Sequence, residues 1–230
     1  MGISKSGFGM GFGALAVPLM ALAVPVPQAA AIMLPLLMVA DAMGLAALVR
    51  HRDRVLVRRL LPPALLGVGL GWAGFGLLSP SAAAGLLGVV TLVFLALRTL
   101  WPPRADAPPP SARTGQALSV VSGFTSFIAH AGSPPLAFYL LPLKLEPLVF
   151  TASTSVIFAA VNAAKWVPYG LLGLLDLRNL LTSLALLPLV PLGVWLGLRF
   201  VRRVSPQLFY RLFNLGLLLT GLKLVADALR

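Results

Sequence analysis

The sequence predicts an all-α protein: a polytopic membrane helix bundle of about seven or eight segments, built from two tandem repeats with broken or re-entrant first segments. Three observations predict this fold. Of the 230 residues, 59% are hydrophobic and 10% are charged, and the mean hydropathy is +0.95. Apolar runs long enough to cross a bilayer follow one another with short gaps between them. The second half of the chain repeats the spacing of prolines and glycines found in the first half.

Charged or proline-rich gaps separate the apolar segments. The segments run over Gly7–Val24, Gln28–Val49, Leu60–Leu78, Ser81–Leu100, Gln116–Leu143, Pro147–Leu175, Leu177–Phe200 and Gln207–Ala228. The clearest interruption is residues 101–114, whose prolines and charges cannot continue a helix or lie in hydrocarbon. We therefore divide the chain into a first membrane repeat at 1–100, a linker at 101–114 and a second repeat at 115–230, which together form one membrane domain.

The charged residues exclude several classes of function. Lys and Arg number 18 and Asp and Glu number 6, so the formal net charge is +12. Because the basic residues lie mainly between apolar runs, they are typical of cytoplasmic loops rather than of a nucleic-acid surface. The chain has no cysteine and two isolated histidines, so we expect neither a metal site nor a cofactor. No HExxH, GxSxG or paired-acid spacing is present, so we expect no enzyme.

The two halves share a pattern of prolines and small residues displaced by 126 positions. Pro62, Gly67, Gly71 and Ser79-Pro80 recur as Pro188, Gly193, Gly197 and Ser205-Pro206. This repetition indicates an internal duplication of about four segments. In each copy the two glycines form GxxxG, which favours close helix packing. The alternative is that these glycines line a narrow pore or let one helix slide past another.

The basic residues alternate between equivalent gaps of the two repeats. The gap at 50–59 carries five Arg and one Asp, whereas its counterpart LDLRN has one of each. In the next gap, LLSPSA is uncharged and RFVRRVSP has three Arg. Because cytoplasmic loops collect Lys and Arg, the alternation predicts repeats of inverted topology. An odd number of crossings per repeat is then required, so we expect the first segment of each to be re-entrant.

These first segments read SKSGFGMGFGALAVP and SGFTSFIAHAGSPPLAFY, and both are rich in Gly and Ser. Unwound backbone at membrane depth is tolerated only inside protein or around a wet cavity, so we expect these segments to line the substrate path. Helix N-termini that open there would direct N–H groups toward an anion. The alternative is flexible kinks with packing serines. Candidate substrate-binding residues in the two segments are Ser4, Lys5, Ser6, Gly9, Gly11, Ser126, His130, Gly132 and Ser133.

Ionisable residues inside spans are costly and usually functional. Asp41 and Lys165 lie at similar depths on equivalent segments, and Asn162 precedes Lys165 by one turn. One interpretation is a structural ion pair between the halves, and another is a site in which Lys165 and Asn162 attract the substrate while Asp41 handles protons. A third is that one charge snorkels to the interface. His130 either relays protons with Asp41 or makes an ordinary hydrogen bond.

Three stretches carry a resemblance to a known family. They are SGFGMGFGALAVPLMALAVPVPQAAAIMLP in the first half, and GFTSFIAHAGSPPLAFYLLP and TASTSVIFAAVNAAKWVPY in the second. Over essentially the whole chain, the sequence resembles the sulfite exporter TauE/SafE family. The resemblance implies a multi-pass secondary carrier of the bacterial cytoplasmic (inner) membrane. It would export a small sulfur-containing anion such as sulfite, sulfoacetate or a related organosulfonate. The alternative is a passive anion channel or an uncharacterised permease subunit.

The resemblance also implies the partners of the protein, which are the lipid bilayer, a small anion and a coupled proton. Assembly into homo-oligomers stays open.

Two features depart from the family pattern. The chain starts almost at the first glycine motif, where family members carry a further apolar stretch, so either the translation start is misplaced or the first arm is missing. We expect the N-terminal residues themselves to belong to the mature fold. In addition, residues 130–133 replace a glycine-dense run, which would shift substrate preference.

Overall fold

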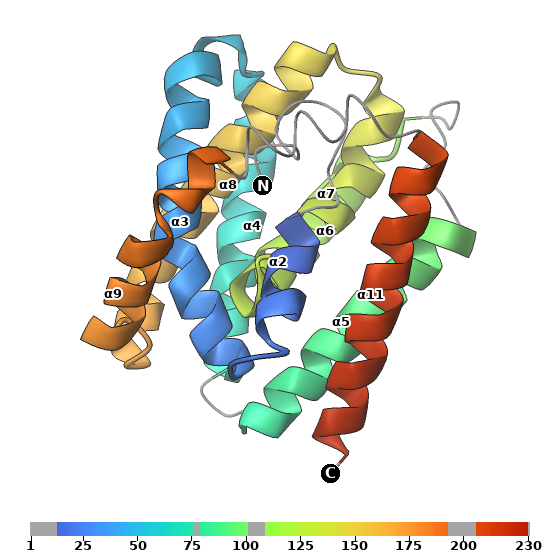
Figure 1. The fold of residues 1–230 in the computed structure, drawn as a ribbon. Helices are drawn as coiled ribbons and strands as arrows, with labels where there is room; N and C mark the ends of the chain where they lie inside the picture. Colours follow the sequence, from blue (N-terminus) through green and yellow to red (C-terminus); the bar gives the residue numbers. More distant parts are fainter. Residues whose placement is uncertain (1–12, 76–78, 101–108, 193–205, 230) are drawn as a thin grey trace.

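The computed structural model describes residues 13–75, 79–100, 109–192 and 206–229 (Figure 1). All regular secondary structure in these ranges is helical, which confirms the all-α prediction for this part of the chain. The elements are α2 (Gly13–Met20), α3 (Val26–Leu48), η1 (Val49–His51), α4 (Arg54–Phe75), α5 (Pro80–Leu100), α6 (Ala112–Ala129), α7 (Ser133–Leu140), η2 (Leu141–Leu143), α8 (Pro147–Leu171), α9 (Leu177–Leu186) and α11 (Pro206–Ala228).

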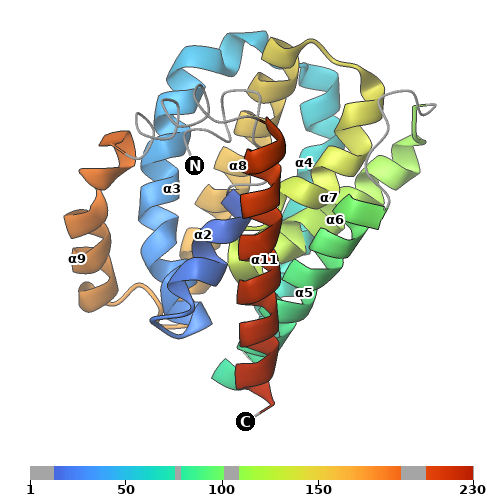
Figure 2. The ribbon, with the colours of Figure 1, turned by 45° about the vertical axis from the view of Figure 1, so that its right-hand side comes forward.

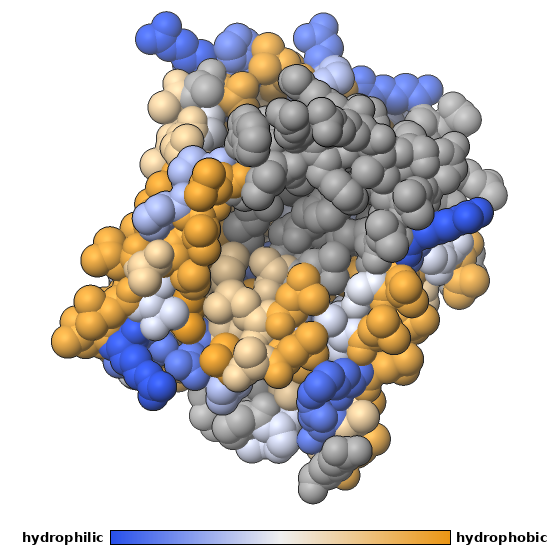
Figure 3. Space-filling model, in the orientation of Figure 1, coloured by the Kyte–Doolittle hydropathy of each residue, from blue (hydrophilic) through white to orange (hydrophobic). Residues whose placement is uncertain are grey.

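The bundle has the surface of a membrane protein. Three of the described helices, α3, α4 and α8, are long and apolar enough to cross a bilayer. Large apolar side chains face outward, among them Val167 with 68% of its surface exposed and Leu184 with 62%. Figure 3 shows apolar side chains over the flanks and hydrophilic ones gathered toward the ends. Such a continuous apolar exterior suits contact with lipid and not with water.

Three predicted segments differ from the structure. Helix α4 begins at Arg54, ahead of the predicted start at Leu60. The cause is Asp53, whose Oδ1 accepts hydrogen bonds from the backbone N–H groups of Val55 (2.9 Å) and Leu56 (3.0 Å) and so caps the helix. The arginines expected in a loop therefore lie on the first turns of α4. In addition, the predicted segment 116–143 is divided into α6, α7 and η2, and the predicted segment 177–200 is interrupted where α9 ends at Leu186.

Helices α3 and α8 run side by side in opposite directions (Figure 1). Near one end, the Asp53 N–H after α3 donates to Ser153 Oγ early in α8 (2.9 Å). Near the other end, Gln28 Nε2 at the start of α3 donates to Asn179 Oδ1 on α9, which follows α8 (3.1 Å). The contacts therefore pair the beginning of each helix with the end of the other.

Glycines allow α4 and α6 to touch backbone to backbone. A Cβ added to Gly67 would overlap the Val120 carbonyl, and one added to Gly123 would overlap the Ala64 carbonyl. Gly71 packs in the same way against the ring of Phe127. These contacts confirm that the first GxxxG motif serves helix packing. Its counterpart at 193 and 197 lies outside the described residues.

A second glycine-lined pair is formed by α5 and α11, which lie side by side in both views (Figures 1 and 2) and opposite α9 in Figure 1. Cβ atoms added to Gly85 and Gly88 would meet Ala228 at 2.9 Å and Val225 at 2.8 Å. A Cβ on Gly221 would meet Leu92 at 2.8 Å. The contacts again run in opposite order along the two helices, so this pair is antiparallel.

The α4–α6 contact predicts the effect of two glycine substitutions. Gly67→Ala and Gly123→Ala should each destabilise the protein by about 1–3 kcal/mol, because the new methyl group overlaps backbone that can move only if the helices separate. Thermal unfolding of the detergent-solubilised protein measures the effect. Gly69→Ala is the matched control, since a Cβ there meets nothing within 4 Å. Equal midpoints for all three variants would contradict this description of the helix contact.

Candidate functional site

The second broken segment forms a helical hairpin. Helix α6 ends at Ala129, and His130 adopts a left-handed conformation with φ 52°. The His130 N–H donates back to the Ser126 carbonyl (2.9 Å). Helix α7 then returns beside α6, so that a Cβ on Gly115 early in α6 would overlap the Tyr139 ring near the end of α7. The chain thus reverses inside the bundle, at a break that the glycine and serine content predicted.

Hydroxyl groups of α6 hold the turn between the two helices. Ser122 Oγ donates to the Gly132 carbonyl (2.6 Å), and Thr125 Oγ1 lies within hydrogen-bonding distance of the Ala131 carbonyl (3.0 Å). Gly132 is needed for close approach, because a Cβ there would meet the Ser122 carbonyl at 2.6 Å. These bonds satisfy carbonyl groups that the turn would otherwise leave without partners in an apolar interior.

The Lys165 ammonium lies against this hairpin. Lys165 is fully buried on α8, and its Nζ donates to four acceptors. They are the Ser126 carbonyl (2.7 Å), Ser126 Oγ (2.7 Å), Asn162 Oδ1 (2.9 Å) and His130 Nδ1 (3.0 Å). Because an ammonium has three hydrogens, two of these acceptors share one N–H. All four acceptors are neutral groups.

Two side chains extend the network into the first half of the chain. Asn162 Nδ2 donates to Asp41 Oδ2 on α3 (2.6 Å), so the Asn162 amide links the carboxylate of Asp41 to Lys165. His130 Nε2 lies 2.9 Å from the Ala30 carbonyl. A carbonyl only accepts hydrogen bonds, so Nε2 carries the hydrogen and Nδ1 accepts from Lys165. The arrangement therefore requires a neutral imidazole.

Tyr169 completes the same face of α8, one turn after Lys165. Its hydroxyl donates to the Phe127 carbonyl in the last turn of α6 (2.6 Å). The Tyr169 and Phe127 rings pack edge to face with centroids 5.1 Å apart. Tyr169 thus binds a carbonyl in the last turn of α6, where a helix leaves C=O groups unsatisfied, and Lys165 binds the neighbouring Ser126 carbonyl, which also accepts the His130 N–H.

The helix end that faces the polar cluster at the break is the C-terminal end of α6, whereas an N-terminal end was expected. Helix N-termini were expected to aim N–H groups at an anion, but Lys165 contacts the carbonyl end of α6, where the helix dipole is negative. In addition, the first turn of α7 contains Pro134 and Pro135, which have no N–H to donate. A cation is therefore the natural occupant of the α6 terminus, and the ammonium of Lys165 fills that role.

Five of the predicted site residues come together in this cluster, namely Asp41, Ser126, His130, Asn162 and Lys165. Gly132 shapes the turn, and Ser133 is the half-buried first residue of α7. Ser4, Lys5, Ser6, Gly9 and Gly11 lie outside the described residues. In the described ranges no group of three His, Asp or Glu side chains could hold a metal ion.

Four groups of this network were not predicted from the sequence, namely Tyr169, Ser122, Thr125 and the Ala30 carbonyl. A signal for Tyr169 was available, since Asn162, Lys165 and Tyr169 are spaced by three and four residues and therefore share one face of a helix. Ser122 and Ser126 are related in the same way on α6. No signal identifies the Ala30 carbonyl, because a backbone group carries no mark in the sequence.

The comparison with protein families agrees with this architecture. The family model described as Sulfite exporter TauE/SafE matches residues 1–224. The chain belongs to the sulfite exporter TauE/SafE family. Because this is a family of membrane transporters, the protein is a multi-pass membrane transporter. No curated protein and no solved structure matches the chain significantly.

The contact between Tyr169 and α6 predicts the effect of removing one hydroxyl. Tyr169→Phe should cost about 1–3 kcal/mol of stability, because it leaves the buried Phe127 carbonyl without its donor. Tyr139→Phe is the matched control, since Tyr139 is also buried and its hydroxyl has no hydrogen-bond partner among the described residues. Thermal unfolding in detergent compares the two variants. A loss as large for Tyr139→Phe would mean that the hydrogen bond is not the cause.

Proposed function

We propose that this protein is a secondary carrier that exports a small sulfur-containing anion, such as sulfite, sulfoacetate or a related organosulfonate, across the bacterial cytoplasmic membrane. This proposal rests mainly on the buried Lys165 ammonium at the break between α6 and α7. The family description names sulfite, which supports the substrate class.

The neutral environment of Lys165 favours an anion as its substrate. A charge buried in a membrane protein is costly unless it is compensated, and the four groups bonded to Nζ carry no formal charge. Asp41 is linked to the ammonium through Asn162. An oxyanion that takes the place of one neutral acceptor would supply a direct counter-charge and would meet a strong donor. Because the ammonium is fully buried, substrate entry requires α6, α7 or α8 to move.

We infer that Asp41 and His130 couple this movement to a proton. Both are connected to Lys165 by hydrogen bonds, His130 directly and Asp41 through Asn162. When an anion displaces His130 from Lys165, the Nδ1 of His130 is freed to accept a proton. A homo-oligomeric assembly is compatible with this mechanism but is not required by it.

The arrangement of the helices supports inverted repeats and alternating access. Asp41 and Asn162 each lie fifteen residues after the first residue of their helix, and they contact each other. Equivalent positions of two repeats meet in this way only near the axis that relates them. The α3–α8 and α5–α11 pairs are both antiparallel, as an inversion demands of equivalent helices. The two halves would then rock against each other around the cluster.

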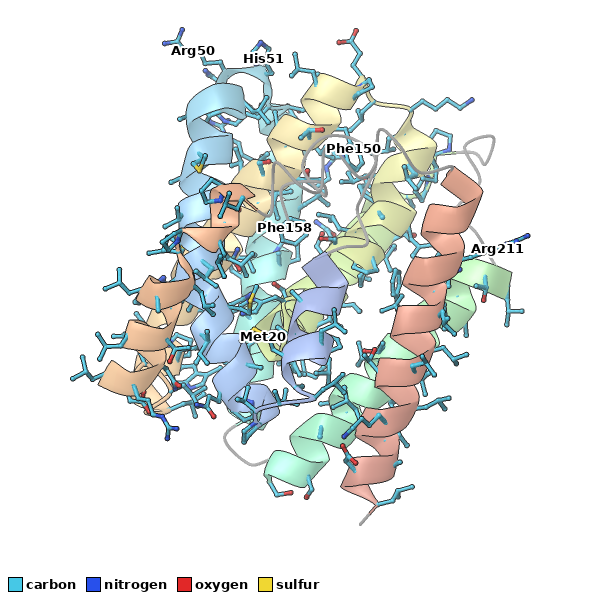
Figure 4. All side chains as sticks on the ribbon, viewed as in Figure 1. Met20, Arg50, His51, Phe150, Phe158 and Arg211 are labelled. Carbon is cyan, nitrogen blue, oxygen red and sulfur yellow. The ribbon has the colours of Figure 1, made fainter. Side chains whose placement is uncertain are left out.

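This proposal predicts which chain segments lie on the same side of the membrane. The loop after α3 and the turn before α8 are at one end of the bundle, and the α4–α5 and α8–α9 connections are at the other (Figure 1). Figure 4 shows Arg50 and His51 pointing away from the bundle at the first end. Because Arg clusters there, this end should be cytoplasmic.

The absence of cysteine makes this topology directly measurable. Single variants Arg50→Cys and Lys144→Cys should be labelled by a membrane-impermeant thiol reagent only after cells are opened. Ser79→Cys and Arg178→Cys should be labelled in intact cells whose outer membrane has been permeabilised. The four side chains are all exposed, so burial does not confound the comparison. Labelling of Arg50→Cys and Ser79→Cys from the same side would contradict the proposed topology.

The role of Lys165 predicts a transport defect. In proteoliposomes, Lys165→Ala should lower the initial rate of labelled sulfite uptake by a factor of about ten or more, since one lost charge-assisted contact costs about 1.5–3 kcal/mol. Lys144→Ala should stay within about twofold of the unchanged protein, because Lys144 is exposed in the turn before α8. Counterflow, in which unlabelled sulfite inside drives labelled sulfite inward, distinguishes a carrier from an open channel.

The transport assay needs a control for loss of protein stability, because Lys165→Ala also removes a buried hydrogen-bond donor. Tyr169→Phe serves this purpose, since it weakens the same α6–α8 contact without removing the charge. Equal transport losses in Lys144→Ala and Lys165→Ala would overturn the role of Lys165, as would an equal loss in Tyr169→Phe. Uptake without counterflow would indicate a channel.

A further inference from the structure

A basic pocket lies at the end of the bundle where the chain passes from α3 into α4. Its volume is about 240 Å³, and its lining residues are Arg52, Arg54, Val57 and Arg58. Arg52 Nη1 donates to the Val49 carbonyl (2.5 Å), which ties its guanidinium back to the end of α3. Arg54 and Arg58 are one turn apart on α4, so their side chains lie on one face. Three arginine residues therefore line one small space.

The positive charge of the three arginines that line this pocket exceeds the single negative charge of Asp53 beside them. Asp53 is adjacent in sequence, but its Oδ1 is engaged in capping α4. Within the described part of the chain, an ion pair joins Lys223 and Asp227, but both residues lie on α11 and not at this pocket. Cations one turn apart on a helix repel each other. A bound anion would relieve this repulsion, and phosphate is the group whose oxygens arginine binds best in bidentate fashion.

An apolar stripe continues from the pocket along the outer face of α4. Leu65 and Trp72 follow Arg58 at seven-residue intervals and are 37% and 40% exposed. Gly69 lies between them, and a Cβ there would meet nothing within 4 Å. At 1.5 Å per residue, Leu65 is roughly 16 Å along the helix from Arg54, close to half of a hydrocarbon core of about 30 Å. One acyl chain spans that distance.

We propose that this surface is a binding site for an anionic phospholipid, with the lipid phosphate between Arg52, Arg54 and Arg58 and one acyl chain along α4 as far as Leu65. The apolar stripe favours a lipid over a soluble phosphate, which has nothing to place against Leu65. Arg58 lies deeper in the membrane than Arg54, and its long side chain reaches back to the headgroup level by snorkelling. The proposal is independent of the transported substrate.

The charge bias of cytoplasmic loops does not by itself account for this geometry. That bias requires only that Lys and Arg lie on one side of the membrane, and Arg50 and Arg59 satisfy it while lining no part of the pocket. Both are exposed, as are Arg54 and Arg58. The chain thus offers two matched pairs of arginines on the same loop and helix, with equal charge and different positions.

The experiment compares the variants R54Q/R58Q and R50Q/R59Q with the unchanged protein. Each protein is delipidated in detergent and titrated with phosphatidylglycerol or phosphatidylcholine, and bound lipid is counted by native mass spectrometry. R54Q/R58Q should bind phosphatidylglycerol about tenfold more weakly than the unchanged protein, whereas R50Q/R59Q should stay within about twofold. Phosphatidylcholine binding should be similar in all three. Thermal unfolding verifies that both variants are folded.

Two further arms separate a lipid from a soluble anion. Inorganic phosphate is titrated as a competitor, and Leu65→Gln removes the apolar contact without changing the arginines. A lipid site predicts weak competition by phosphate and loss of phosphatidylglycerol affinity in Leu65→Gln. Equal affinities in the two double variants would overturn the proposal. It would also fail if phosphate displaced the lipid at equal concentration or if Leu65→Gln bound phosphatidylglycerol unchanged.

Discussion

A charged ammonium buried inside a membrane bundle must find hydrogen-bond acceptors within the protein, because lipid supplies none. Lys165 meets this constraint at the carbonyl end of α6, where it donates to the Ser126 carbonyl, which also accepts the His130 N–H. A continuous α6 would run past His130 and bond the carbonyls that follow Ser126 to the N–H groups four residues on. The left-handed His130 ends the helix instead, and the side chain of the same residue supplies a further acceptor for the ammonium.

The rest of the central bundle follows from this break. Because the chain reverses at residues 130–132, α7 returns beside α6 and α8 begins again at the end of the bundle from which α6 came. Helix α8 then presents Asn162, Lys165 and Tyr169 to α6 from one face. The glycines of α4 let it press against α6, and Phe127 of α6 packs against both Gly71 of α4 and Tyr169 of α8. The α3 helix joins through Asp41 and Ala30, so each half of the chain contributes to a single polar cluster.

Much of this arrangement could be predicted from the sequence. The apolar runs anticipated α3, α5, α8 and α11 to within a few residues, since hydrophobic length is a strong signal in a membrane chain. Gly67 and Gly71 pointed to close packing, and the rarity of ionisable residues in the spans pointed to Asp41, His130 and Lys165.

Other features depend on three-dimensional contacts that residue spacing does not encode. The start of α4 was placed too late because hydrophobicity ignores the capping carboxylate of Asp53. The Asn162 bridge and the Phe127 and Ala30 carbonyls arise from helices that meet only in the fold. The direction of the helix dipole at Lys165 depends on which end of the broken segment faces α8, and the Gly and Ser content is the same in either case.

The central claim is that the Lys165 ammonium holds the transported anion. An experimental structure of the protein with bound sulfite tests it most directly. The account predicts an anion within hydrogen-bonding distance of Lys165 Nζ, in place of one of its four neutral acceptors and with α6 or α7 displaced. An anion bound elsewhere, with the contacts of Lys165 to Ser126, His130 and Asn162 unchanged, would contradict it.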